Sequence, residues 1–367
     1  DMVSMARPLL ADPAWVNKAR EGRRDHINTC IACNQACLDH VFVNKRASCL
    51  VNPRACAETE LNYLPAAAAK KIAVVGAGPA GLACATVAAG RGHRVTLFDS
   101  AAEIGGQFNL AKTIPGKEEF HETLRYFGKQ IETTGVELRL GQRVGTAELA
   151  NAGFDAVVLA TGIRPRKVDF PGADHPKVVS YLDVLQGRVV PGRKVAIIGA
   201  GGIGFDVAEF LVHKGHSPSL DTGRWMAEWG VAPDFEGPGG LAPPRPEAPA
   251  RELWLLQRSP GKPGARLGKT TGWIHRAALK AKGVQALGRV EYLGVDDTGL
   301  RIRVDGREQM LPVDHVVVCA GQEPLRELLE PLQVAGVQAH LIGGADVAAE
   351  LDAKRAIDQG SRLAAAL

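Results

Sequence analysis

The sequence predicts an α/β protein with two doubly wound parallel sheets, and two repeated patterns predict it. The apolar runs Ile72–Val75 and Lys194–Ile198 each lead into a glycine-rich turn that opens an apolar helical segment. A further apolar strand follows each helix, at Arg94–Phe98 in the first case and at Glu252–Gln257 in the second. A strand, a helix and a strand in this order form a βαβ unit with parallel strands.

The composition is that of a folded globular protein. The chain has 367 residues, of which 46% are hydrophobic and 23% charged, and this length predicts two or three domains. The net charge of +4 is too small and too dispersed for a nucleic-acid-binding surface. Because no secretory signal is visible and glycines interrupt the uncharged run Ile72–Gly90, we expect a cytoplasmic protein without a membrane span.

Five of the seven cysteines lie between Cys30 and Cys56. In the spacing Cys30-x2-Cys33-x3-Cys37-x11-Cys49, three thiols fall within eight residues and a fourth follows after a loop. This pattern is typical of an iron–sulfur cluster. Four cysteines also suit zinc, although zinc sites usually pair two short CxxC knuckles, and unligated thiols are the third interpretation. Cys56 is interpreted as a spare thiol.

The first glycine turn has the sequence Gly76-Ala-Gly-Pro-Ala-Gly81. Gly76 and Gly78 would allow the tight turn and the approach of a pyrophosphate, and Gly81 would allow close packing of helix on strand. Asp99 ends the next strand, where a carboxylate accepts hydrogen bonds from ribose hydroxyls and repels a 2′-phosphate. The turn therefore predicts FAD or NAD, with a purely structural turn as the alternative.

The second glycine turn, Gly199-Ala-Gly-Gly-Ile-Gly204, repeats the pattern with Gly201 in the middle. The strand after it is followed by Arg258, at the place where the first unit has an aspartate. A guanidinium there would bind a ribose 2′-phosphate, which favours NADPH over NADH. The alternative is that Arg258 is a solvated surface charge.

Three further segments predict local structure. Residues His340–Asp346 are expected to form a strand and a turn before a helix over Ala348–Ala365, with Asp346 placed either to bind a ribityl chain or to cap the helix. Residues 215–250 are rich in proline and glycine and predict an irregular insertion. A short strand is expected to end at Arg7-Pro8, with a helix from about Pro13.

With these motifs the chain resembles the C-terminal part of the bacterial-type NADPH-dependent 2,4-dienoyl-CoA reductases, which are related to trimethylamine dehydrogenase and the Old Yellow Enzyme barrels. The resemblance extends over essentially the whole chain. The segments that carry it are Asp1–Pro8, Asn28–Cys37, Ser48–Cys56, Gly105–Asn109, Ile114–Phe120, Leu267–Arg276 and Cys319–Pro324.

The resemblance implies two Rossmann-like dinucleotide-binding domains, the NADPH domain inserted in the FAD domain, after an iron–sulfur segment and the C-terminal remnant of a (β/α)8 barrel. The expected bounds are 1–23 for the end of the FMN-binding barrel, 24–62 for the [4Fe-4S] segment, 71–170 and 326–367 for the FAD domain, and 171–325 for the NADPH domain. The opening at Asp1 predicts a fragment that lacks nearly all of the barrel.

The resemblance also assigns the site residues. The cluster ligands are Cys30, Cys33, Cys37 and Cys49, and the FAD contacts are Gly76, Gly78, Gly81, Asp99 and Asp346, with Gln107 near the flavin. The residues on the NADPH side are Gly199, Gly201, Gly204 and Arg258, and Arg7 matches the arginine near the FMN phosphate. The acids that protonate the substrate belong to the barrel, so no catalytic residue is expected in this chain.

The implied function is electron transfer from NADPH through FAD and the cluster to FMN, for reduction of 2,4-dienoyl-CoA in the β-oxidation of unsaturated acyl-CoA. The expected partners are small molecules, namely NADPH and, through the barrel, the dienoyl thioester, and neither a nucleic acid nor a membrane is expected. Two other functions stay open: an NADPH:flavin electron donor like the small subunit of glutamate synthase, and a non-catalytic module that only binds a nucleotide. Iron and flavin contents separate the last of these from the others.

Overall fold

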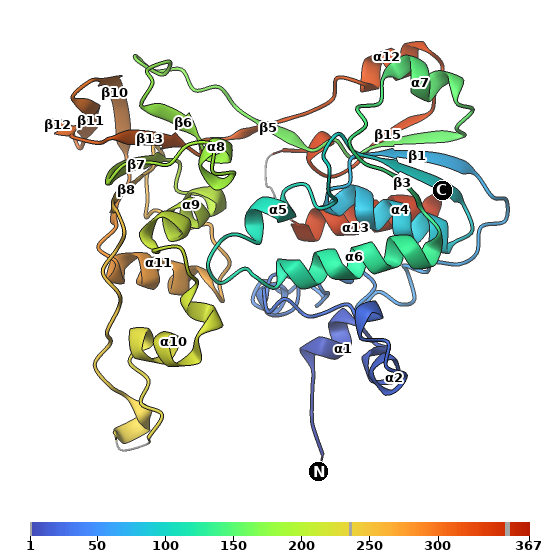
Figure 1. The fold of residues 1–367 in the computed structure, drawn as a ribbon, viewed down its shortest axis with the longest axis horizontal. Coiled ribbons are helices and arrows are strands. Elements are labelled where there is room, and N and C mark those ends of the chain that lie inside the picture. The colour runs from blue at the N-terminus through green and yellow to red at the C-terminus, as the bar shows by residue number, and fades with distance from the viewer. Residues whose placement is uncertain (1, 235–236, 349–352) are drawn as a thin grey trace. The chain divides into compact units, whose positions relative to one another are not determined.

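The computed structural model describes residues 2–234, 237–348 and 353–367, which form two compact units (Figure 1). Unit 1 consists of Asp1–Asn109, Glu119–Arg164 and Gln322–Leu367, and unit 2 of Leu110–Glu118 and Pro165–Gly321. A two-stranded sheet, β5 (Ile163–Pro165) with β14 (Gln322–Pro324), lies where the chain leaves unit 1 and returns to it. In the described part of the chain, no helix is long and apolar enough to cross a membrane.

Unit 1 contains a five-stranded parallel sheet in the order β15-β4-β1-β2-β3. The strands are β1 (Lys71–Val75), β2 (Arg94–Phe98), β3 (Glu137–Arg139), β4 (Ala156–Leu159) and β15 (Ala339–Leu341). The central strand β1 is buried from Ile72 to Val75, and a strand covered on both faces is expected to be apolar without alternation. The predicted strands at Ile72–Val75 and Arg94–Phe98 are confirmed.

Helices cover both faces of this sheet (Figure 1). On one face lie α4 (Pro79–Gly90), α6 (Phe120–Thr134) and α13 (Ala353–Ala366), and on the other α7 (Thr146–Asn151) and α12 (Leu329–Val334). The approach of α13 to α4 requires a glycine, because a Cβ on Gly360 would lie 2.3 Å from the backbone oxygen of Ala80. The short helix α5 (Phe108–Ala111) precedes α6.

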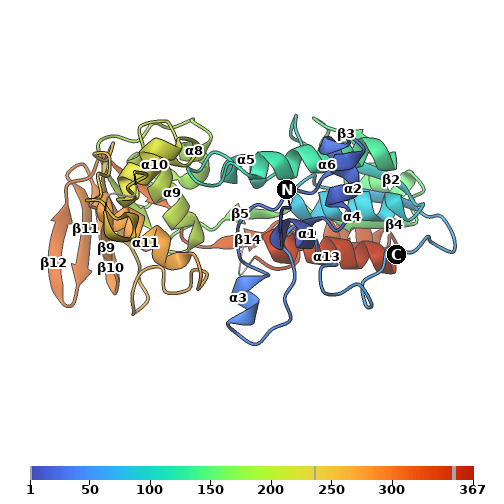
Figure 2. The same ribbon diagram turned by 90° about the horizontal axis from the view of Figure 1, so that it is seen from below.

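The N-terminal segment has α1 (Arg7–Ala11), α2 (Trp15–Arg20), the 3-10 turn η1 (Arg24–His26) and α3 (Leu38–Val41), which lies on a loop (Figure 2). The strand predicted to end at Arg7-Pro8 is wrong: residues 2–6 form no strand. An extended segment needs a neighbouring strand to pair its backbone groups, and none is beside residues 2–6. Pro8 instead lies in the first turn of α1, where its missing N–H is not needed.

The end of the chain differs in part from its prediction. The turn η4 (Gly343–Ala345) follows β15, and Ala348 is not helical. Residues 349–352 of the predicted helix Ala348–Ala365 lie outside the described residues. The described part of α13 begins at Ala353, and its buried side includes Ala356, Ile357 and Gly360.

Unit 2 contains a second parallel sheet in the order β6-β13-β7-β8-β9. Its strands are β6 (Val178–Ser180), β7 (Lys194–Ile198), β8 (Glu252–Leu256), β9 (Gln285–Leu287) and β13 (His315–Val318), with helices α8 (Tyr181–Leu185), α9 (Gly202–Val212) and α11 (Gly272–Ala281). The strand–turn–helix at Lys194 and the strand at Glu252 are confirmed.

An antiparallel sheet in unit 2 was not predicted. It is the meander β10 (Val290–Asp296), β11 (Gly299–Val304) and β12 (Arg307–Leu311). Val290, Leu300 and Ile302 pack with Ile198 and Leu256 in one buried cluster, so the meander supplies apolar contacts to one face of the parallel sheet. The helix α9 covers the other face of the sheet. Its side chains Phe205 and Leu211 pack with Val195 of β7 and Leu253 of β8.

The insertion at residues 215–250 is less irregular than expected. Its described residues, 215–234 and 237–250, contain the 3-10 turns η2 (Pro218–Leu220) and η3 (Pro238–Gly240) and one α-helix, α10 (Thr222–Trp229). The Asp221 carboxylate accepts a hydrogen bond of 3.1 Å from the Arg224 N–H and caps α10, while Gly230 ends it at φ +69°. These two end signals explain a helix inside a segment rich in proline and glycine.

Candidate functional site

The glycine turn of unit 1 joins β1 to α4, and its three glycines have different surroundings. Gly76 has φ +110°, and a Cβ on it would lie 2.3 Å from the backbone oxygen of Ala160. A Cβ on Gly81 would lie 1.8 Å from the oxygen of Gly76, so this glycine lets α4 begin directly against β1. A Cβ on Gly78 would meet nothing within 4 Å. The middle glycine thus faces open space, where a phosphate can approach the unpaired N–H groups at the start of α4.

Asp99 lies beside this turn, directly after β2. Its Oδ2 accepts a hydrogen bond of 2.7 Å from the backbone N–H of Ala77, and its Oδ1 accepts one of 2.8 Å from Ala101. The two bonds hold the carboxylate next to the turn and leave it further acceptor capacity. The position suits the ribose contact that the sequence predicts.

The segment Gly105-Gly106 packs onto the same turn. The Gly105 N–H donates to the oxygen of Ala77 at 2.8 Å, and a Cβ on Gly106, which has φ +52°, would lie 3.0 Å from the Cα of Gly78. Gln107 follows with an exposed side chain. The glycine pair Gly105-Gly106 before α5 allows this close approach to Ala77 and Gly78. The sequence analysis used the pair only as part of the family resemblance.

Asp346 lies on the wall of a cavity of about 590 Å³ lined by residues of β15 and α13. Its Oδ2 accepts a hydrogen bond of 2.7 Å from Gln359 Nε2, and Gln359 Oε1 accepts one of 2.8 Å from the Gly343 N–H. His340 also lines the cavity; its Nε2 is buried without a hydrogen-bond partner, and burial lowers the pKa of its imidazole. A polar ligand in this cavity would satisfy that nitrogen. The sequence analysis missed both Gln359 and His340, because only the folded chain places these residues of α13 and β15 on one cavity.

The glycine turn of unit 2 repeats the geometry of the first. Gly199 has φ +110° and lies against the backbone oxygen of Cys319, 2.7 Å from where its Cβ would be. A Cβ on Gly204 would lie 1.8 Å from the oxygen of Gly199, whereas one on Gly201 would meet nothing within 4 Å. The turn between β7 and α9 is therefore a second place where backbone can approach a phosphate.

Arg258 is exposed and lies two residues after β8. Because β8 pairs with β7 up to Ile198 and Leu256, Arg258 follows the strand end that adjoins the second turn. Its charge lowers the pKa of Tyr292, which burial raises by a larger amount. Lys262 and Arg266, which could supply a second phosphate contact, are also exposed.

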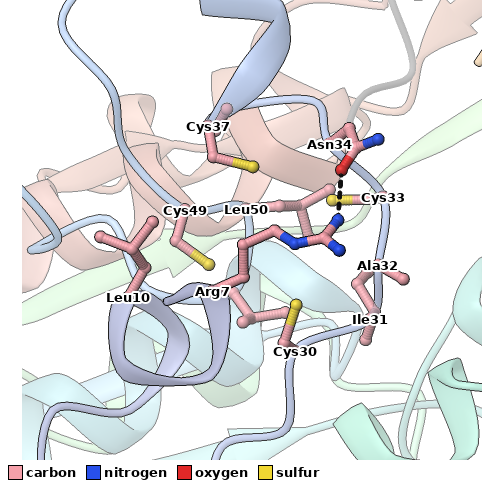
Figure 3. Close-up of a pocket in the computed structure, with 12 residues that line it drawn as sticks. Arg7, Leu10, Cys30, Ile31, Ala32, Cys33, Asn34, Cys37, Cys49 and Leu50 are labelled. Carbon is pink, nitrogen blue, oxygen red and sulfur yellow. Dashed lines mark hydrogen bonds between the residues drawn. The ribbon is translucent and has the colours of Figure 1, made fainter. Parts of the chain in front are cut away.

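The cavity of the N-terminal segment is lined by Cys30, Cys33, Cys37 and Cys49, and Figure 3 shows the four thiols around it. Arg7 lines the same cavity, and its guanidinium donates a hydrogen bond of 2.7 Å to Asn34 Oδ1 (Figure 3). Cys56 is exposed and does not line it.

Burial raises the pKa of Cys33 and of Cys49 to about 11, and backbone N–H groups of Gln35 and Val51 hydrogen-bonded to these sulfurs partly oppose the shift. Both thiols are therefore protonated at neutral pH until a metal displaces the protons. Among the described residues no group of three or more His, Cys, Asp or Glu side chains is placed so that it could hold one metal ion. Four cysteine thiols on one cavity are a donor set of the kind that both iron–sulfur clusters and zinc sites use.

The sequence analysis also missed a buried acid, Glu209 of α9. Burial raises its pKa to about 8, and the neighbouring carboxylates of Asp206 and Glu228 add to the shift. Glu228 itself pairs with Lys282 at 2.5 Å, and that ammonium is almost fully buried. Glu209 is therefore largely protonated at neutral pH.

Residues 70–353 match the family model of the pyridine nucleotide-disulphide oxidoreductases. The chain belongs to this family, whose fold binds FAD and NAD(P)H. Both Rossmann-like sheets and both glycine turns lie within the matched range.

Three relatives are informative. The chain is 34% identical over 349 residues to a metal reductase of Desulforamulus reducens, which covers 94% of this chain and 51% of that protein. It is 32% identical over 356 residues to an NADH oxidase of Thermoanaerobacter brockii, covering 94% and 49%. A solved 2-naphthoyl-CoA reductase superposes with a TM-score of 0.84 at 28% identity, over 99% of this chain and 50% of that one.

The chain spans about half the length of these relatives. It is a flavin-dependent NAD(P)H oxidoreductase module related to the reductases of the Old Yellow Enzyme and trimethylamine dehydrogenase group.

Proposed function

We propose that this chain oxidises NADPH and passes the electrons to a flavin site outside its own sequence. The observation that carries the proposal is the duplicated turn, in which the outer glycines are enclosed by backbone and the middle one faces open space. Such a turn lets backbone reach a pyrophosphate. Two of them in one chain supply places for a dinucleotide donor and a dinucleotide acceptor.

The residues that would hold each group follow from these positions. FAD would lie on the turn Gly76–Gly81, with Asp99 on its ribose, Asp346 on its ribityl chain and Gln107 nearby. NADPH would lie on the turn Gly199–Gly204, with Arg258 on the 2′-phosphate. A [4Fe-4S] cluster would be held by Cys30, Cys33, Cys37 and Cys49. When bound, FAD accepts a hydride from NADPH and the cluster carries single electrons, which matches a two-electron donor to one-electron steps.

We further propose that the whole protein is an NADPH-dependent 2,4-dienoyl-CoA reductase, in which an FMN-binding barrel outside this chain reduces the thioester. The segments named in the sequence analysis support this substrate, and the similar 2-naphthoyl-CoA reductase is named for a thioester of CoA. Arg7 would then serve the FMN phosphate from a position next to the thiols.

Metal and flavin analysis of the anaerobically purified chain tests the proposal. We expect about four irons and about one FAD per chain, and NADPH-dependent reduction of an artificial acceptor such as ferricyanide. Cys37→Ser should lose the iron and keep the FAD, because the thiol site and the glycine turn are separate. The matched control Cys56→Ser should keep both, since that thiol does not line the cavity.

A colourless chain that still binds ADP would contradict the proposal and favour a non-catalytic nucleotide-binding module. Reduction of a dienoyl thioester by the 367-residue chain alone would contradict the placement of the substrate site outside it.

A further inference from the structure

The chain that leads into the first two thiols of the cavity has little regular structure of its own. After the 3-10 turn η1, residues 27–34, which include Cys30 and Cys33, form neither a helix nor a strand. The backbone oxygens of such a segment need hydrogen-bond donors from elsewhere in the fold. The proposed function assigns two thiols to this segment but no residue that holds the segment in place.

An arginine of α6, Arg125, binds this part of the chain with most of its guanidinium group. Its Nη1 donates to the backbone oxygen of Asp25 at 2.6 Å and to that of Arg24 at 3.4 Å. Its Nη2 donates to the backbone oxygen of Ile27 at 2.8 Å and to Thr29 Oγ1 at 3.2 Å. Four of the five N–H donors of the guanidinium thus bind residues just before the first thiol.

The fifth donor is used within α6. Nε of Arg125 donates to Glu122 Oε2 at 2.8 Å, and the same carboxylate oxygen accepts a bond of 3.4 Å from Thr29 Oγ1. The arginine side chain is only 23% exposed, so these bonds are partly shielded from water. Because every donor of the planar group has an acceptor, the guanidinium is held in one orientation.

The helix that carries this arginine is itself packed firmly in unit 1. Phe127 and Ile131 of α6 are buried in the largest apolar cluster of that unit. At the start of the helix, the ring of Phe120 stacks on that of Phe108 with the centroids 4.6 Å apart. Helix and thiol segment both belong to unit 1. The guanidinium therefore attaches the thiol segment to the core of its own unit.

A second set of contacts joins the two ends of the thiol segment. The backbone N–H of Asn28 donates to Asp12 Oδ2 at 2.8 Å, and its side-chain Nδ2 donates to the backbone oxygen of Val51 at 2.8 Å. The N–H of Val51 is in turn hydrogen-bonded to the sulfur of Cys49. Asn28 and Asp12 are both buried. A shift of the chain before Cys30 would therefore disturb the fourth thiol as well.

We propose that Arg125 is a positioning residue of the thiol site, which holds the chain before Cys30 so that this thiol stays on the cavity with the other three. The inference rests on the proposed function, which gives Cys30 a cluster to bind. Without the guanidinium, the backbone oxygens of Asp25 and Ile27 lose this donor, and the chain before Cys30 gains freedom to move off the cavity. Loss of a residue that orients a metal ligand typically weakens metal binding by about 10–100-fold.

The experiment compares Arg125→Met and Arg125→Lys with the wild-type chain after anaerobic purification. Methionine keeps a long side chain without N–H donors, and lysine keeps the charge with three donors instead of five. The matched control is Lys129→Met, which removes an ion pair of 2.8 Å with Glu132 on the same helix. The readouts are the rate of iron release to a chelator, the EPR spectrum of the reduced cluster, the FAD content, and amide hydrogen exchange of residues 24–30 before and after removal of the iron.

We expect Arg125→Met to release iron about 10–100-fold faster, with FAD content within about twofold of wild type. It should also alter the EPR spectrum, which reports the ligand geometry, and speed hydrogen exchange of residues 24–30. Arg125→Lys should be intermediate in these readouts, and Lys129→Met should match wild type.

Three results would overturn the positioning role. They are unchanged iron release, unchanged exchange of residues 24–30, and exchange that is faster throughout unit 1, which would show general unfolding. A wild-type chain that binds no iron refutes the proposed cluster, and with it the role of Arg125 toward a cluster. Faster exchange in the iron-free Arg125→Met chain would in that case still support the hold of the guanidinium on the segment.

Discussion

The two glycine turns have the same backbone and opposite charge beside them. Gly76 and Gly199 both have φ +110°, and Gly81 and Gly204 would both place a Cβ 1.8 Å from the preceding turn oxygen. The strand after the first helix is followed by Asp99, whereas the strand after the second is followed, two residues on, by Arg258. Packing of a helix on a strand therefore sets the turn, and we expect one side chain outside the turn to decide which dinucleotide fits.

The helices after the turns differ as well. The tenth residue after the first glycine is Thr86 in α4 and Glu209 in α9, and both are 8% exposed. The Thr86 hydroxyl donates to the oxygen of Leu82 at 2.8 Å within its own helix. Glu209 is instead largely neutral at pH 7, because burial raises the pKa of its carboxyl group to about 8. Equivalent positions in similar folds thus carry different electrostatic costs.

The largest effect is expected from alanine at the third glycine of either turn. Gly81→Ala and Gly204→Ala would each force a Cβ into backbone and should destabilise the chain by about 1–3 kcal/mol or more. Gly78→Ala and Gly201→Ala, in the open middle positions, should cost less than about 1 kcal/mol but weaken dinucleotide binding. Urea unfolding and bound FAD measure the two effects, and equal destabilisation by all four variants would contradict the equivalence of the turns.

The next effect concerns pH and distinguishes α9 from α4. The pKa of Glu209 is about 8 in the folded chain against 4.5 for the ordinary group, so its contribution to stability is complete below pH 4.5 and is lost as the pH rises through 8. Glu209→Gln should remove a slope of up to about 1.4 kcal/mol per pH unit between these values. Urea unfolding from pH 5 to 8.5 measures it. Thr86→Val should shift stability equally at every pH, and parallel curves for wild type and Glu209→Gln would show that the glutamate does not titrate in this range.

A smaller effect tests the charge difference directly. Arg258→Ala should lower the preference for NADPH over NADH by about 10–100-fold, because one charge-assisted contact to the 2′-phosphate is lost. Titration with both nucleotides measures the ratio. Arg307→Ala, which removes an exposed arginine of the meander, is the control, and an unchanged ratio in Arg258→Ala would mean that this side chain is a solvated charge.

The smallest effect is expected for Asp99, the acidic residue beside the first glycine turn. Asp99→Asn keeps one acceptor oxygen for the Ala77 N–H but loses the negative charge, so FAD binding should weaken only by about fivefold, or roughly 1 kcal/mol. Fluorescence titration of FAD measures it. Arg258→Ala should leave this affinity unchanged if the two turns hold separate dinucleotides.

Sequence reasoning worked where one local signal decides the structure. The strands at Lys71–Val75 and Lys194–Ile198 are short apolar runs before glycines, and both were predicted. It failed for the strand before Arg7, because a strand requires a partner that no local pattern reveals. It also missed the meander Val290–Leu311, whose apolar side chains are explained by the sheet face that they cover.

The same division applies to the candidate site. Glycines, cysteine spacing and the residues at strand ends could be found in the sequence because each works at a fixed distance along the chain. The bond of Gln359 to Asp346 and the unpaired nitrogen of His340 could not be found in this way, since these residues share a cavity only when α13 packs beside η4. The contact of Lys117 with Asp206 is likewise invisible in a sequence that separates them by 89 positions.

By itself the sequence determined the class of fold, the two turns and the four clustered thiols, because glycine conformation, apolar runs and thiol spacing act locally. Only the tertiary structure decided which side chains surround those features. Burial raises the pKa of Glu209 and of Cys33, and folding brings Lys117 Nζ to within 2.6 Å of Asp206 Oδ1. Both effects depend on contacts between residues that are far apart in the sequence, and these contacts form only in the folded chain.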